Sequence, residues 1–171
     1  MQTMPSICVL GTPVESFGLP SGRTVQVKRE DLSCPPPGPP FSKGRGVLAH
    51  IASRPESVLG VLDTYHRKGG WAVAYACLEL GRQSVNFYPR FKADGPDLRD
   101  PQVRSAEFGA ALVDLPAGRS AILYHAAKKR LRAMHGDAAY MMPNALKLPE
   151  SIEETAQEVL RTDATAEHWI V

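Results

Sequence analysis

Residues 39–51 read PPFSKGRGVLAHI, and this stretch joins a proline-rich loop to the first helical pattern of the chain. The prolines between Pro35 and Pro40 fix φ and lack an N–H, so they exclude a helix or a central strand there. Apolar residues then recur with helical spacing over 47–51. We therefore expect a helix to begin at or just after Lys43.

Lys43 has two interpretations at this position. A helix start lies near the positive end of the helix dipole, which favours the neutral form of an amine. A neutral amine is what a lysine needs in order to bond covalently to an aldehyde. The alternative is a solvated lysine with no chemical role, because lysines are mostly exposed in proteins.

The composition is that of an ordinary globular chain. It has 171 residues, of which 43% are hydrophobic and 22% charged, as expected for one domain with a sizeable core. The net charge of +2 is spread without a long basic run, which gives no electrostatic argument for nucleic acid as a partner. No apolar run reaches 18 residues, so we expect no membrane span.

The cysteines and the N-terminus indicate a cytoplasmic location. Cys8, Cys34 and Cys77 are odd in number and far apart in the chain, without the spacing of a zinc site. Reduced thiols are the default for such a chain. Residues 1–5 lack the charged and apolar regions of a signal peptide. We predict no metal site.

Strand-like and helix-like segments alternate along the chain. After an extended arm with turns over 1–24, we expect strands at 24–28, 57–62, 83–88, 110–114, 138–142 and 168–171. We expect helices at 43–53, 71–80, 102–108, 117–134 and 151–161, the last opened by a capping box of Ser151 and Glu154. This alternation predicts an α/β fold, a mostly parallel sheet in a three-layer αβα arrangement.

We divide the chain into an arm, strand and proline-rich loop over 1–42 and an α/β domain over 43–171. Ligands of parallel sheets bind in the loops at the carboxyl ends of strands. The loops with the most chemically useful side chains are 29–43 and 63–70.

Two motifs around the proline-rich loop carry a family resemblance. The segment KREDL at 28–32, followed by the loop and by FSKGRG at 41–46, resembles the N-terminal half of the tryptophan-synthase-β-like enzymes. These are the fold type II pyridoxal-phosphate enzymes, which include threonine dehydratase, threonine synthase and aminocyclopropane-carboxylate deaminase. The resemblance implies that Lys43 holds pyridoxal 5′-phosphate as an imine and that Arg45 is a supporting group at the helix start.

A second motif of the family is only half present. The family has a serine-glycine-asparagine-histidine-glycine loop before a helix of small residues, and residues 71–81 are similar to that helix. The loop over 63–70, DTYHRKGG, departs from the motif. This departure makes the chain more similar to divergent members of this fold, such as those associated with phages. The residues that we expect to contact the cofactor here are Thr64, His66 and Lys68, with the backbone of Gly69 and Gly70. The alternative is an ordinary polar turn between a strand and a helix.

A third motif, the loop that grips the cofactor phosphate, follows in the family a strand with the character of 167–171. The resemblance covers nearly all of this chain and about the first half of a family enzyme. We therefore expect an incomplete fold type II domain that binds the cofactor poorly alone, since amides and a helix dipole converge on the phosphate in that loop.

The resemblance implies a pyridoxal-phosphate-dependent enzyme of the lyase or deaminase type that acts on an amino acid or amine. One alternative is a non-catalytic or split protein of this fold, completed by a second copy as a homodimer or by a complementing C-terminal polypeptide. The other is a small α/β ligand-binding domain in which Lys43 has no special role.

Overall fold

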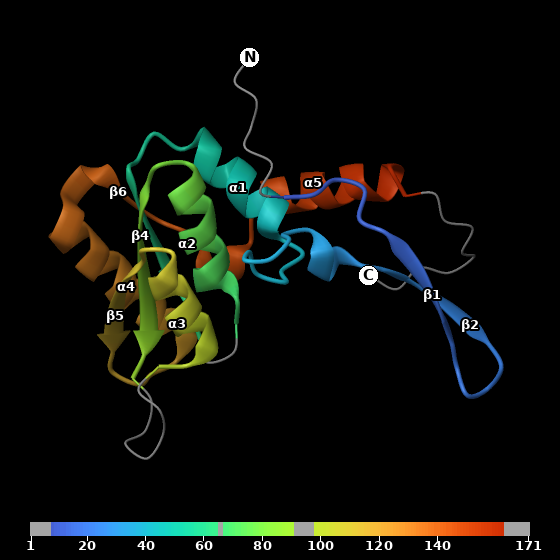
Figure 1. The fold of residues 1–171 in the computed structure, drawn as a ribbon. Coiled ribbons are helices and arrows are strands. Elements are labelled where there is room, and N and C mark those ends of the chain that lie inside the picture. Colours follow the sequence, from blue (N-terminus) through green and yellow to red (C-terminus); the bar gives the residue numbers. More distant parts are fainter. Residues whose placement is uncertain (1–7, 65–66, 91–97, 163–171) are drawn as a thin grey trace.

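The computed structural model describes residues 8–64, 67–90 and 98–162. Its centre is a parallel sheet with the strand order β5-β4-β3-β6 (Figure 1). The strands are β3 (Val58–Leu62), β4 (Gln83–Pro89), β5 (Ala111–Leu115) and β6 (Ala139–Met141). Every residue of β3 is buried, as expected of a strand that is covered on both faces.

Helices cover both faces of this sheet. The helices α1 (Gly44–Ser53), α2 (Gly69–Glu79) and α3 (Asp100–Glu107) lie on one face, where α1 and α2 share a core with Leu59 and Val61 of β3. The helix α4 (Ser120–His135) packs on the other face through Leu123, Ala127 and Leu131. The expected α/β fold with a three-layer arrangement and a parallel sheet is confirmed.

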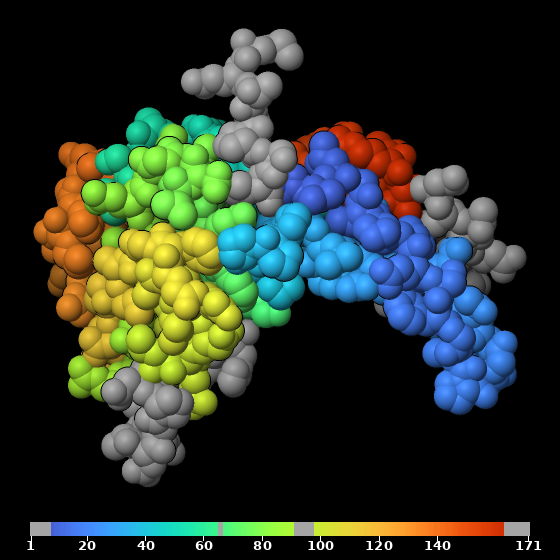
Figure 2. All heavy atoms as spheres, in the orientation of Figure 1, coloured from blue at the N-terminus to red at the C-terminus, as the bar shows by residue number. Residues whose placement is uncertain are grey.

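A second group of elements extends sideways from this body. The helix α5 (Pro149–Leu160) packs along α1, and a hairpin of β1 (Val14–Gly18) and β2 (Thr24–Lys28) lies beyond it. A short 3-10 turn, η1 (Glu30–Leu32), connects the hairpin to the proline-rich loop. Figure 2 shows the hairpin standing away from the body, so that one edge of the molecule is concave.

Two local predictions are wrong. The arm expected over 1–24 contains β1, which forms because the predicted strand 24–28 pairs with it in antiparallel register. The predicted capping box at Ser151 does not start α5. The helix begins at Pro149, because Leu148 before this proline is held extended and the proline suits the first helical turn.

Ser151 has a packing role instead. A Cβ atom added to Gly46 would lie 2.4 Å from the Cα of Ser151, so the glycine lets α1 and α5 approach closely. The Ser151 hydroxyl is buried and has no hydrogen-bond partner among the described residues. The strand predicted at 168–171 lies outside the described residues, and the division of the chain after residue 42 stays a prediction.

None of the helices within residues 8–64, 67–90 and 98–162 has the length and apolar character that a membrane crossing requires.

Candidate functional site

Lys43 lies at the carboxyl edge of the parallel sheet. It is the residue directly before α1, its side chain is exposed, and its Nζ donates a hydrogen bond of 3.4 Å to the carbonyl oxygen of Ala145. Ala145 follows β6 in the chain and so lies near the carboxyl ends of the parallel strands. This is the edge at which parallel sheets place their ligands.

The turn that accepts this hydrogen bond has a strained backbone. Ala145 and Leu146 both have positive φ, 59° and 50°, although neither is a glycine. Left-handed backbone costs a residue with a side chain roughly 1–2 kcal/mol, and such residues cluster at functional sites. The strained residue Ala145 is therefore the same residue that accepts the hydrogen bond from Lys43.

The same turn brings Lys43 and the start of α2 together. A Cβ atom added to Gly69 would lie 3.2 Å from Cδ1 of Leu146, so the first residue of α2 packs against the residue after Ala145. Lys68 is the residue before α2. Of the candidate contacts in this loop, Thr64 is half-buried and donates its backbone N–H to Asp63 at 3.0 Å. His66 lies outside the described residues.

Asp63 is a group at this site that the sequence analysis did not single out. It follows β3, it is 1% exposed, and its carboxylate also accepts the N–H of Gly70 at 3.3 Å. Burial raises the pKa of Asp63 to about 7, against the effect of these backbone hydrogen bonds and of Asn86. Gly70 is needed for this contact, since an added Cβ would lie 2.2 Å from Nδ2 of Asn86.

Arg45 bonds to residues that precede α1 in the chain. Its guanidinium is buried, pairs with Glu30 and donates to the carbonyl oxygen of Val9 at 3.0 Å. It therefore supports the segments ahead of the helix start, and it is not among the groups that face the Ala145 turn.

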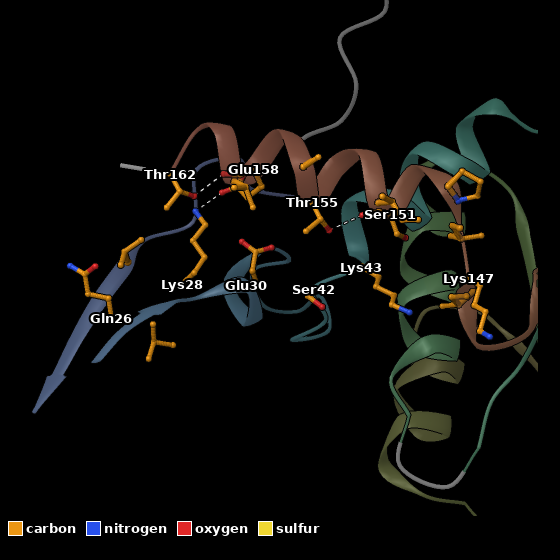
Figure 3. Close-up of a pocket in the computed structure, with 18 of the residues that line it drawn as sticks. Gln26, Lys28, Glu30, Ser42, Lys43, Lys147, Ser151, Thr155, Glu158 and Thr162 are labelled. Atoms are coloured by element: carbon orange, nitrogen blue, oxygen red, sulfur yellow. Dashed lines mark hydrogen bonds and ion pairs between the residues drawn. The ribbon is translucent and has the colours of Figure 1, made fainter. Parts of the chain in front are cut away.

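A large apolar groove lies between the hairpin and α5. Its volume is about 1270 Å³, and residues 146–149 close it at the end where Lys43 and Lys147 lie (Figure 3). Most of the other lining residues come from β1, β2 and α5, among them Val14, Val25, Val27, Ile152, Ala156 and Val159. Several of these are exposed, with Ile152 at 74% and Val159 at 49%. Apolar surface of this extent marks an interaction site.

A buried ion pair holds the far end of the groove. Glu158 of α5 is 2% exposed, and its carboxylate accepts Lys28 Nζ at 2.6 Å and the N–H groups of Thr12 and Gly11 at 2.9 and 3.1 Å. Burial alone would raise its pKa, but the Lys28 ammonium and the two N–H groups lower it to about 2. The pair thus attaches α5 to the hairpin (Figure 3).

These residues fit one part of a site for an aldehyde cofactor. Lys43 supplies an accessible amine at a helix start, and the strained turn provides an acceptor that orients it. Lys68 and the start of α2 lie around the same turn. No three His, Cys, Asp or Glu side chains of the described ranges converge in a way that could hold a metal ion.

A phage protein is similar to this chain in sequence, and solved structures are similar to it in fold. Over 156 residues the chain is 60% identical to the glycyl-dTMP PLP-dependent decarboxylase of Pseudomonas phage M6, covering 90% of this chain and 55% of that protein. No family model matches. The chain superposes on a homologue of ACC deaminase with a TM-score of 0.75 at 18% identity, covering 95% of this chain and 50% of that one.

A serine racemase from Dictyostelium discoideum superposes with a TM-score of 0.62 at 18% identity, covering 92% of this chain and 48% of the racemase. The chain thus spans about half the length of each of these relatives.

Proposed function

We propose that this chain forms the lysine-bearing part of a pyridoxal-phosphate-dependent enzyme. Two findings support this: its relative in a phage is named a PLP-dependent decarboxylase, and the chain has the fold of the N-terminal portion of the fold type II pyridoxal-phosphate enzymes. Lys43 is the residue that holds the cofactor. The observation that carries this proposal is the Lys43 amine at the start of α1, hydrogen-bonded to a strained turn at the carboxyl edge of the sheet.

The chain's own residues bind and orient at this site. The cofactor, when bound, supplies an electron sink for the bond that breaks at an amine-bearing carbon. The Ala145 carbonyl accepts the hydrogen bond from Lys43 Nζ and so orients that amine beside the carboxyl ends of the strands. The Asp63 carboxylate accepts a hydrogen bond from the N–H of Gly70 and so fixes the first turn of α2 beside the carboxyl edge of the sheet.

The name of the phage relative favours decarboxylation as the reaction. That name describes a glycyl group on a thymidine nucleotide as the substrate. We propose an amino-acid-like group as the substrate class of this chain as well, supported by 60% identity over 90% of its length. The deaminase-like reaction and the cytoplasmic location stay predictions, as does the lack of nucleic-acid binding.

The proposal is tested by titrating the chain with pyridoxal phosphate and recording the near-visible absorbance of the bound aldehyde. We expect a saturable band for the unaltered chain that is lost in Lys43→Ala. The matched control is Lys147→Ala, which removes another exposed lysine of the same groove and keeps the band. A band of equal strength in Lys43→Ala, or none in the unaltered chain at millimolar cofactor, overturns the proposal.

We also propose that a C-terminal polypeptide completes the site by covering the apolar groove, and the specific observation in favour is the groove itself. The matched part makes up 55% of the length of the phage relative, so about 45% of that protein lies outside it. The test mixes the chain with a polypeptide that corresponds to this remainder and measures association by sedimentation. We expect a one-to-one complex that Ile152→Lys weakens and that Ile122→Lys, on exposed α4 surface, leaves intact. No complex, or a homodimer alone, contradicts this partner.

A further inference from the structure

Two of the three cysteines lie against each other beside the start of α1. The sulfur atoms of Cys8 and Cys34 are 3.1 Å apart, although the residues are 26 positions apart in the chain. Cys34 is 3% exposed and Cys8 is half-buried, whereas Cys77 is buried in the core with α1 and α2. Solvent therefore reaches the pair through Cys8.

The backbone around the pair is already fixed. The N–H of Val9 donates to the carbonyl oxygen of Ser33 at 2.7 Å, and Arg45 donates to the carbonyl oxygen of Val9 at 3.0 Å. Both hydrogen bonds involve residues next to the cysteines. A disulfide holds its sulfurs about 2 Å apart, so its formation takes a side-chain shift of about 1 Å within a held frame.

The surroundings favour one thiolate in the pair. The two sulfurs share a hydrogen bond in which either S–H can be the donor. This contact with Cys8 lowers the pKa of the Cys34 thiol against the effect of burial, and Ser33 and Arg45 lower it further. The same hydrogen bond and burial raise the pKa of Cys8. A thiolate beside a second sulfur is the arrangement from which thiol oxidation proceeds to a disulfide.

We propose that Cys8 and Cys34 are an oxidation-sensitive pair that closes to a disulfide and ties the N-terminal segment to the proline-rich loop. With a peroxide as oxidant, the two S–H bonds and the O–O bond break, one S–S bond forms, and the peroxide takes up two electrons and two protons to become two waters. A reducing thiol reverses the step.

This pair is placed to act on the candidate lysine. A Cβ atom added to Gly44, the residue after Lys43, would lie 2.1 Å from Sγ of Cys34. The sulfur thus lies against the first residue of α1, and the disulfide restrains the segment that carries Lys43.

The test treats the full chain with hydrogen peroxide, blocks the remaining thiols after unfolding, and maps the peptides by mass spectrometry. We expect a linked peptide pair that contains Cys8 and Cys34, with Cys77 blocked as a free thiol. The melting temperature of the oxidised chain is expected to rise by roughly 10 °C, from the closure of a loop of this length. Cys8→Ser removes both effects, and Cys77→Ser is the matched control that keeps them.

The proposal is overturned if Cys8 and Cys34 are blocked as fully as Cys77, or if the linked peptides contain Cys77. A melting temperature that rises equally in Cys8→Ser also overturns it, since that rise has another cause. None of these readouts depends on cofactor binding, so the result is independent of the function proposed above.

Discussion

Replacing Glu158 by glutamine is expected to weaken the attachment of α5 to the hairpin. The native pKa of this carboxyl is lowered from 4.5 to about 2, and each unit corresponds to about 1.4 kcal/mol. The ionised form therefore contributes about 3 kcal/mol, since the side chain is only 2% exposed. Glutamine keeps the shape of the side chain and loses the charge that Lys28 pairs with.

The pH dependence gives this prediction its sharpest form. A lowered native pKa contributes stability that is present above pH 4.5 and lost as the pH falls toward 2. Urea unfolding of Glu158→Gln should show a loss of about 3 kcal/mol in the free energy of unfolding at pH 7, and about half that loss at pH 3. Glu153→Gln on the exposed side of α5 is the control. A loss under 1 kcal/mol at pH 7, or an equal loss at both pH values, refutes the reasoning.

Three further predictions concern the sheet edge and the start of α1. The native pKa of Asp63 is raised from 3.8 to about 7, so the free energy of unfolding should fall by about 4 kcal/mol as the pH rises from 4 to 8. Urea unfolding of Asp63→Asn should lack that decline, and an unchanged decline in this variant would contradict the assignment. Ala145→Gly should raise the free energy of unfolding by about 1 kcal/mol by relieving the positive φ; no gain in urea would argue against strain in the turn. Gly44→Ala should cost about 1–3 kcal/mol because its Cβ meets Cys34, and calorimetry should find Gly18→Ala, which meets nothing within 4 Å, close to neutral.

The body of the fold follows from patterns that lie within single segments. β3 is buried on both faces and α1 on one face, so both segments need apolar residues at fixed positions. These positions appear in the sequence as the continuous apolar run of β3 and the helical spacing over 47–51. The sequence does not predict the pairing of β1 with β2, because the glycines and prolines around β1 are typical of turns. β1 itself reads VESFG and has no apolar–polar alternation that would distinguish it as a strand, whereas its partner β2 does alternate.

The candidate site was predictable only in part, for a similar reason. Lys43 is marked by its place between a proline-rich loop and a helix, so sequence alone singles it out. Its contact with Ala145 joins residues 102 positions apart, and no local pattern encodes that distance. Asp63 reads as the first residue of a polar loop, and its burial becomes visible only once β3 and α2 are packed.

The most direct test of the central claim is a peptide map of the chain after incubation with pyridoxal phosphate and reduction with borohydride. The account predicts that the reduced cofactor label lies on the peptide containing Lys43, with the Lys147 peptide largely unlabelled at the same cofactor concentration. Label distributed evenly over the exposed lysines, or absent from Lys43, would contradict it.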